Sequence, residues 1–193
     1  MRRKDREMGE EFALQVIDKA RFGVMSLVDD QEAYGIPLSI ARIGRKLYFH
    51  SAKAGKKVEL IPKNPKVHIS FVGEHHVPTV FDKNAVEEMT SEPEKFAQLT
   101  SKIFTTEFES AMVLGFIQKL ENDDEKIKGL RAICEKFTPQ WMAYFDKAIA
   151  SGLKVTDVYV IDIEELTAKR KKFDAFGEEM KWQRMEESKE KGL

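Results

Sequence analysis

The most constraining feature of the sequence is a change in hydrophobic period after residue 20. Residues 4–20 place apolar side chains at helical spacing between charged ones, which predicts an amphipathic helix. The next apolar runs, at residues 22–28, 35–43 and 46–50, are short, rich in β-branched and aromatic residues, and separated by turns of a few residues. A parallel pair would need a crossover of roughly a dozen residues or more. These runs therefore predict consecutive antiparallel strands and exclude a Rossmann sheet.

The remainder of the chain continues this pattern with helical interruptions. Residues 84–102 are polar, lose strand alternation, and are interpreted as an insertion that leaves the barrel. Asn122 with Glu125 three residues later resembles a capping box. Gly115 interrupts a long strand, where a bulge or a close backbone approach is expected. Further strands are expected at residues 66–72, 77–81, 108–120, 155–163 and 167–173, and helices at 55–61, from 123 onward, and from Pro139. This order predicts an α+β barrel.

Length and charge indicate one globular domain without an overall electrostatic signal. The 193 residues are 42% hydrophobic, enough for one core, and we assign residues 1–175 to the barrel and 176–193 to a charged, helical tail. Lys and Arg total 32 against 33 Asp and Glu, which gives no case for nucleic acid. The single Cys134 cannot form an intramolecular disulfide, and we interpret it as an inert core residue rather than a reactive thiol. With no leader or membrane-spanning apolar run in the sequence, a soluble, cytoplasmic protein is expected.

Residues 47–57 carry the most chemical information. This segment combines the end of a strand at His50, the hydroxyl of Ser51, a turn at Gly55, and the adjacent Lys56 and Lys57. Hydroxyl, backbone N–H and ammonium groups together suit a phosphate dianion. The segment is not a Walker loop, because it lacks the first glycine and the Ser or Thr after the lysine. The alternative is a pair of solvated lysines on an exposed turn, with His50 as a packed or surface residue.

In order and spacing, several short motifs resemble the pyridoxamine-phosphate-oxidase-like FMN-binding split barrels, in particular their nitroimidazole-resistance-type branch. The resemblance covers residues 1–173. The motifs are Met1-Arg2-Arg3-Lys4-Asp5-Arg6-Glu7, Gly35-Ile36-Pro37-Leu38-Ser39, Tyr48-Phe49-His50-Ser51-Ala52, Gly55-Lys56-Lys57, Asn64-Pro65-Lys66-Val67, Thr106-Glu107-Phe108-Glu109-Ser110 with Gly115, and Glu125-Lys126 with Gly129-Leu130.

The resemblance implies a six-stranded antiparallel split β-barrel, a homodimer, and FMN bound in a groove at the dimer interface. It implies that Lys57, helped by Lys56 and Ser51, contacts the FMN phosphate, with Ser110 completing that side. It places His50 and Ala52 beside the flavin and backbone groups of Pro37, Leu38, Ser39 and Ile40 at the isoalloxazine edge. His50 is the one candidate for proton delivery to a substrate.

Two departures from the family pattern affect these expectations. Lys56 stands where an arginine is frequent, which replaces a bidentate fork by a point charge. The predicted insertion at residues 84–102 would cover or reshape the pocket. Pyridoxamine-phosphate oxidase activity proper is not favoured, because no additional arginine and histidine set for that substrate's phosphate is evident.

Other clusters suggest weaker hypotheses. His75 and His76 would point to opposite faces of a strand, so no metal site is expected. The basic run at residues 169–172 is typical of a solvated strand edge rather than of a nucleic-acid or membrane contact. Two functions therefore remain: an FMN-dependent reductase of a small electron-poor, nitroimidazole-like substrate that draws on an electron donor, or a flavin- or haem-binding module without turnover, acting as a sensor or storage protein.

Overall fold

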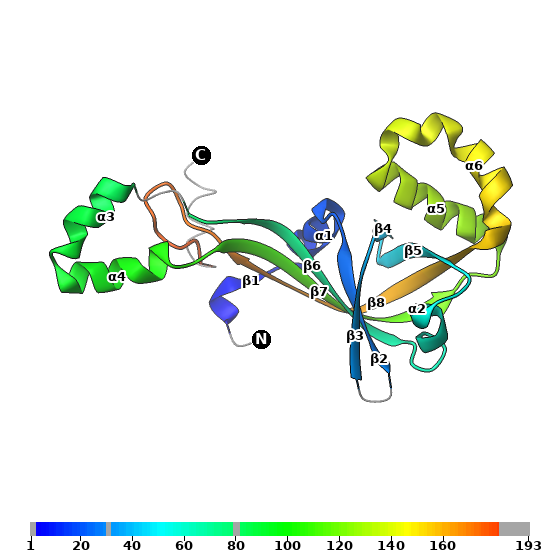
Figure 1. The fold of residues 1–193 in the computed structure, drawn as a ribbon, viewed down its shortest axis with the longest axis horizontal. Helices are drawn as coiled ribbons and strands as arrows, with labels where there is room; N and C mark the ends of the chain where they lie inside the picture. Colours follow the sequence, from blue (N-terminus) through cyan, green and yellow to red (C-terminus); the bar gives the residue numbers. More distant parts are fainter. Residues whose placement is uncertain (1–2, 30–31, 79–81, 182–193) are drawn as a thin grey trace.

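The structure is a computed structural model that describes residues 3–29, 32–78 and 82–181. Its eight described strands form one antiparallel sheet in the order β3-β2-β6-β7-β8-β5-β4, with β1 paired to β8 outside this path (Figure 1). The strands are β1 Glu7–Met8, β2 Gly23–Asp29, β3 Glu32–Leu38, β4 Ala41–Ile43, β5 Lys46–Ala52, β6 Lys66–His76, β7 Glu107–Lys119 and β8 Thr156–Lys171.

Helices lie at both ends of this sheet. They are α1 Glu10–Lys19, α2 Lys56–Leu60, α3 Lys83–Thr90, α4 Pro93–Ile103, α5 Asp123–Phe137 and α6 Phe145–Gly152, with short 3-10 helices at Lys4–Arg6, Pro139–Tyr144 and Leu153–Val155. As predicted, Asn122 caps α5: its side chain accepts a hydrogen bond from the Glu125 N–H at 3.0 Å. No helix in the described part of the chain is long and apolar enough to cross a membrane.

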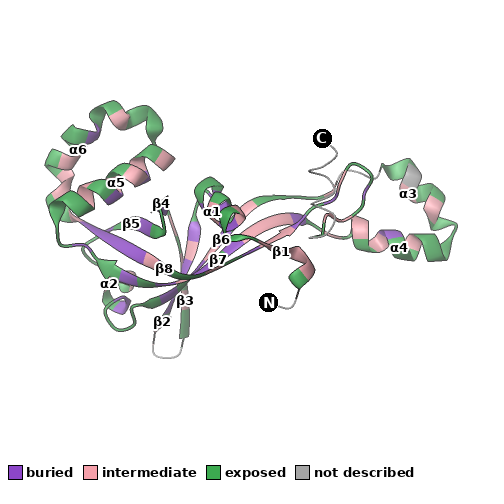
Figure 2. Cartoon of the chain, turned by 180° about the vertical axis from the view of Figure 1, so that it is seen from behind, coloured by how far each residue is buried: buried purple, intermediate pink, exposed green. Residues whose placement is uncertain are grey.

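The core fills the curved part of the sheet and is closed by α1. Phe49, Phe71 and Ile161 are among its almost fully buried side chains, and the ring of Phe49 stacks on Tyr159 with centroids 5.0 Å apart. A second apolar cluster lies on the other face of β5 and β8, where α5 packs; it includes Tyr48, Val158 and Ile133. β5 and the first half of β8 are therefore buried on both faces (Figure 2).

Beyond the barrel, β6, β7 and β8 continue as a long ribbon whose far end carries α3 and α4 (Figure 1). We call residues 82–104 the arm. Residues 84–102, which the sequence analysis predicted to leave the barrel, form most of these two helices. The ribbon bends where Leu114 and Gly115 shift register against β8. A Cβ at Gly115 would lie 2.4 Å from the Asp162 carbonyl oxygen, so the predicted close backbone approach is confirmed.

The α+β class and the antiparallel arrangement are confirmed, but several boundaries were wrong. The sheet has eight strands rather than six because the two-residue β1 and the three-residue β4 add short pairings. The run at residues 35–43 bends at Ser39 and is divided between β3 and β4. The runs at 155–163 and 167–173 form the single strand β8, which the bulge bends without interrupting.

Three predictions near the ends and the arm also need correction. The first helix begins at Glu10, because Gly9 is extended at its N-cap and Glu7–Met8 pair with β8 instead. Val77 and Pro78 form no strand, since β6 already ends at His76, and residues 79–81 lie outside the described residues. The start of the predicted helical tail forms a turn closed by a bridge between Phe173 and Glu179, and residues 182–193 lie outside the described part.

Candidate functional site

The end of β5 brings together two of the residues predicted from the sequence. His50 pairs with Val158 of β8 and is exposed. After β5 the chain turns at Gly55, whose φ of 116° favours glycine, and α2 begins with Lys56 and Lys57. Partial desolvation, and next the positive charge of Lys57, lower the pKa of His50 below its ordinary value of 6.5. An ammonium group and an exposed, mostly neutral imidazole thus share this corner.

Ser51 and Lys56 point elsewhere. Successive strand residues face opposite sides, so Ser51 lies on the other face from His50 and Ala52. Its side chain is buried, and its hydroxyl donates to the Ala52 carbonyl oxygen at 2.8 Å. The Lys56 Nζ lies 2.9 Å from the Asp29 Oδ2 and 4.9 Å from the centre of the Tyr34 ring. The hydrogen bond to Asp29 raises the pKa of Lys56, and this lysine ties α2 to the β2–β3 pair.

The backbone segment predicted to face the flavin forms the bend between β3 and β4. Pro37 and Ser39 are exposed, Leu38 is half-buried, and Ile40 is fully buried in the core. The Ile40 carbonyl oxygen accepts a hydrogen bond from the Lys136 Nζ at 2.9 Å. This carbonyl is therefore already engaged inside the protein.

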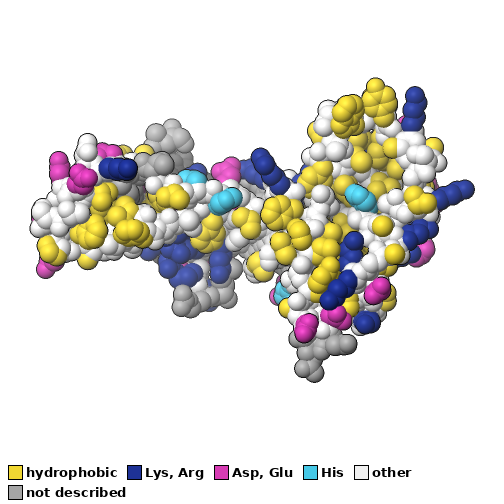
Figure 3. Space-filling model, in the orientation of Figure 1, with side chains coloured by type: hydrophobic (Ala, Val, Ile, Leu, Met, Phe, Trp, Pro, Cys, Tyr) yellow, Lys and Arg dark blue, Asp and Glu magenta, His cyan; other side chains and the backbone are white. Residues whose placement is uncertain are grey.

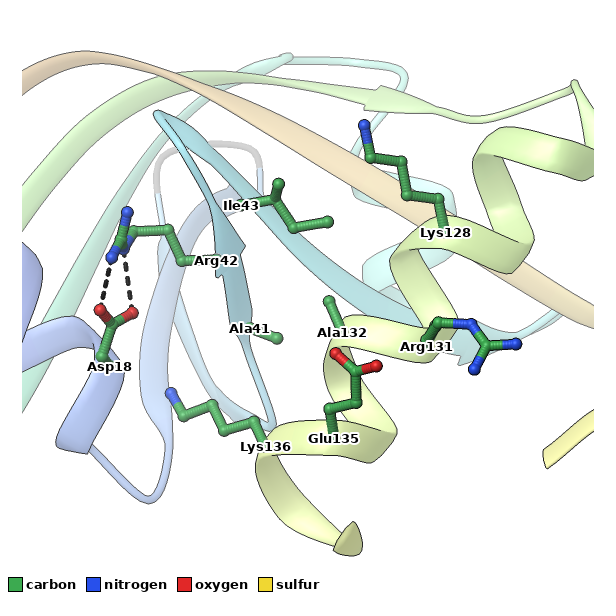
Figure 4. A pocket seen from close by; sticks show the side chains of 9 residues that line it. All are labelled: Asp18, Ala41, Arg42, Ile43, Lys128, Arg131, Ala132, Glu135 and Lys136. Carbon is green, nitrogen blue, oxygen red and sulfur yellow. Dashed lines mark hydrogen bonds and ion pairs between the residues drawn. The ribbon is translucent and has the colours of Figure 1, made fainter. Parts of the chain in front are cut away.

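Lys136 braces this bend, and the sequence reasoning missed it. Its Nζ also donates to the Ile17 carbonyl oxygen at 2.8 Å, near the end of α1. Desolvation lowers the pKa of Lys136 to about 8. Lys136 lines a hollow of about 610 Å³ between α1, β4 and α5, where Arg42 and Asp18 form an ion pair (Figure 4). A lysine in the last turn of a helix gives no signal in the sequence that identifies such distant partners.

Ser110 lies far from the other predicted residues. It is on β7, opposite Lys169 of β8, whereas Ser51 of β5 is opposite Asp157 of β8. Residues 157 and 169 are twelve positions apart on one strand, or about 40 Å at roughly 3.3 Å per residue. Ser110 instead lines a hollow of about 530 Å³ with Met112 and Lys169. Within one chain, Ser110 and Lys57 therefore lie too far apart to contact the same phosphate.

Comparison with known proteins tests the predicted resemblance. Residues 10–85 match the family model described as pyridoxamine 5'-phosphate oxidase. A solved protein from Bacteroides thetaiotaomicron, named as a candidate 5-nitroimidazole antibiotic resistance protein, superposes with a TM-score of 0.64 and 20% identity over 85% of this chain and 86% of its own. The predicted resemblance to pyridoxamine-phosphate-oxidase-like proteins is thus borne out over residues 10–85, and the nitroimidazole resistance protein shares the fold. The matched residues include all of the predicted site except Ser110.

Other solved proteins share the fold. A flavocytochrome from Azotobacter vinelandii has a TM-score of 0.65 and 16% identity, covering 89% of this chain and 70% of its own. A FAD and haem binding protein from Mycobacterium smegmatis also has a TM-score of 0.65 and 16% identity, covering 86% of this chain and 73% of its own. Proteins of curated function give no match to the sequence. At these identities the neighbours establish the split-barrel fold and leave the ligand to be argued from the residues.

Proposed function

We propose that the chain is an FMN-binding flavoprotein, an oxidoreductase that reduces a small electron-poor substrate of the nitroimidazole type with electrons from a separate donor. The proposal includes a cytoplasmic homodimer. The observation that carries it is the juxtaposition of Lys57 with His50 at the end of β5, within the segment that matches the family model. A cation beside a neutral imidazole at a strand end suits a phosphate on one side and a reducible ring on the other.

The position of Ser110 supports two copies in one site. Ser110 and its hollow lie on the outer face of β7 and β8, about 40 Å along the sheet from Lys57 at roughly 3.3 Å per residue. That face exposes half of the Val72 side chain and large fractions of Met112 and Phe116. A twofold-related copy would cover this apolar face and bring Ser110 of one chain to Lys57 of the other. The predicted phosphate contacts would then come from two subunits, because Ser110 and Lys57 of one chain lie far apart.

Each residue has a defined task in this proposal. Lys57 and Ser110 hold the phosphate, and exposed backbone groups of Pro37, Leu38 and Ser39 meet the polar edge of the flavin. When bound, FMN supplies hydride or single-electron chemistry. His50 stands beside the reacting ring, and its lowered pKa keeps it mostly neutral near pH 7. Its N–H therefore donates a hydrogen bond, and proton delivery by His50 increases as the pH falls.

Two assignments are weakened by the contacts within the chain. Lys56 is held by Asp29, and the Ser51 hydroxyl is turned to its own backbone. We therefore assign both to shaping the α2 turn, with Lys57 as the main phosphate cation. The Ile40 carbonyl, held by Lys136, fixes the bend from which the neighbouring backbone groups reach the flavin.

A second function, a flavin- or haem-binding module without turnover, is favoured by the names of two structural neighbours. One is a flavocytochrome and the other a FAD and haem binding protein. Mixing the loaded protein with a nicotinamide donor separates the two functions. Repeated reduction and substrate-dependent reoxidation supports the enzyme, and a cofactor that binds but does not cycle supports the module.

Absorption spectra of the purified chain, titrated in parallel with FMN, FAD and haem, test the cofactor. We expect stoichiometric FMN binding and a loss of affinity of roughly tenfold or more in Lys57→Ala, because a phosphate contact by an ammonium group is removed. Lys46→Ala, an exposed lysine at the other end of β5, is the matched control and should bind normally. A protein that ignores FMN, or a Lys57 variant that binds as tightly as the control, would overturn the proposal.

A further inference from the structure

The arm has little packing of its own. Of its described side chains only Leu99 is buried, whereas Phe104 is 79% exposed at the end of α4. Figure 3 shows hydrophobic side chains on the surface of the arm with acidic ones toward its outer end. Helices of eight and eleven residues are marginal in water without tertiary packing. The apolar surface of the arm is thus available for burial against another surface.

The charge of the arm is opposite to that of the α2 end of the molecule. Residues 82–104 contain five acidic and three basic side chains, a net charge of −2. Residues 53–63, which include α2, contain four basic side chains and one acidic side chain, a net charge of +3, and one of the four, Lys56, pairs with Asp29 of β2. Glu87 and Glu88 on α3 are exposed, and so are Lys53 and Lys63 on either side of α2. Surfaces of opposite charge attract one another and fix orientation.

These two surfaces cannot meet within one chain. The arm and α2 lie at opposite ends of the molecule (Figure 1). The base of the arm is where His76 pairs with Glu107, only three residues along β7 from Ser110. An arrangement that brings Ser110 of one chain to Lys57 of another places the base of the arm about 10 Å from the α2 end of that second chain, at roughly 3.3 Å per residue. The occupant of the α2 end is therefore a second copy of this chain.

We propose that the arm of each subunit docks on the basic α2 end of its partner and forms the substrate-side wall of the partner's flavin groove. The inference rests on the proposed function, because the arrangement of the two subunits follows from placing Ser110 of one chain beside Lys57 of the other. The acidic residues of α3 face Lys53 and Lys63, and the apolar side chains of the arm cover the exposed side chain of His50. A wall of this kind limits the groove to small, flat, weakly charged substrates and excludes water from the reacting ring.

Zero-length carbodiimide cross-linking of the full chain tests the docking directly. Isotopically labelled and unlabelled subunits are mixed so that peptide masses distinguish links between subunits from links within one. We expect amide links between a lysine of residues 53–63 and an acidic residue of 82–94 that join differently labelled peptides. A dimer whose arm cross-links only within its own subunit, or a chain that remains monomeric at micromolar concentration, overturns the inference.

Charge exchange provides a second test. The double variant Glu87→Lys/Glu88→Lys should weaken dimerisation roughly tenfold at low ionic strength and less at high salt. Combining it with Lys53→Glu/Lys63→Glu should restore dimerisation, and Glu11→Lys/Glu121→Lys, at exposed positions outside both surfaces, is the control. Failure of the exchange to restore the dimer contradicts the docking even where the first variant weakens it.

Flavin titration of the same samples separates this inference from the proposed function. Intersubunit links in a protein that ignores FMN would retain the docked arm and reject the cofactor. An FMN-binding dimer without such links would retain the cofactor and reject the arm.

Discussion

The barrel and the ribbon that carries the arm share the strands β6, β7 and β8, yet they differ in how those strands are buried. In the first half of β8, residues from Asp157 to Ile161 are buried on both faces, between the core under α1 and the cluster under α5. Beyond Ile163 the same strand is mostly half-buried or exposed. One strand thus supports a packed core at one end and a free surface at the other.

The difference indicates where stability and recognition reside in this protein. A strand buried on both faces gains from hydrophobic transfer on each side, whereas the ribbon near the arm retains apolar surface that a partner can cover. The barrel should therefore unfold as one cooperative unit, and the arm should open locally at lower cost.

The largest expected effect is the truncation of a barrel core side chain. Phe49 is fully buried and stacked on Tyr159, so Phe49→Ala should lower the free energy of unfolding by about 3–5 kcal/mol in urea titrations. Phe104, which follows α4, is exposed, so Phe104→Ala should change the free energy of unfolding of the barrel by less than about 0.5 kcal/mol. Similar losses for the two variants would show that barrel and arm are one unit.

The bend between barrel and ribbon is the next test. In Gly115→Ala the new methyl group would lie 2.4 Å from the Asp162 carbonyl oxygen, so the strands must separate at a cost of about 2–3 kcal/mol. Gly152→Ala at the end of α6 has open space around the added Cβ and should be neutral or slightly stabilising. Thermal unfolding compares the two; equal melting temperatures would mean that the close approach at the bulge does not constrain the ribbon.

A core truncation within the arm should act locally. Leu99→Ala removes the buried side chain of α4, and we expect the opening free energy of α3 and α4 to fall by about 2 kcal/mol. Hydrogen exchange should show faster exchange in residues 83–103 and unchanged protection in β5 and β8. Gln98→Ala, exposed on the same helix, is the control. Loss of protection throughout the barrel would refute the separation.

The order of elements could be predicted from the sequence because it depends on local patterns. The alternation of apolar and polar residues predicted the antiparallel strands, Gly115 predicted the bulge, and Asn122 predicted the helix cap. Each of these features depends on residues near in the sequence or on the space around the backbone. Contacts between distant segments could not be predicted. The Lys136 amino group reaches carbonyl oxygens 96 and 119 residues away, and Lys56 is drawn to Asp29 by the folding of β2 against α2.

The candidate site shows the same division. The segment from His50 to Lys57 could be selected from its residue types, but the inward direction of Ser51 follows from strand alternation after a boundary that only the fold defines. The distance between Lys57 and Ser110 depends on the course of β8, which the sequence reasoning had divided into two strands. The cofactor contacts of these residues therefore remain predictions to be tested by the flavin titrations.

A smaller effect concerns the lysine that braces the barrel. Desolvation lowers the pKa of Lys136 from 10.5 to about 8, so between these values the unfolded chain binds more protons than the folded one. Stability should therefore rise with pH from about 8 to 10.5. Two N–H groups of the neutral amine still satisfy the Ile17 and Ile40 carbonyls. Relative to Lys136→Met, the wild type should gain about 1–3 kcal/mol over this range in urea titrations, because solvent reduces the effect for a half-buried amino group. Lys95→Met in the arm should leave the pH dependence unchanged.

The smallest expected effect is electrostatic and lies at the α2 end. The folded protein binds a proton at His50 less tightly than the unfolded chain does, so acidification through the ordinary pKa of 6.5 should reduce stability. Because the Lys57 charge contributes to this lowering, Lys57→Met should move the pKa of His50 upward, toward its ordinary value, in an NMR titration of the imidazole. Lys63→Met, an exposed lysine that follows α2, is the matched control and should leave the pKa of His50 unchanged. If the pKa of His50 is unchanged in the Lys57 variant, the two side chains do not lie in one site. The proposal that the phosphate and the reacting ring bind side by side at this end of the barrel would then lose its geometric basis.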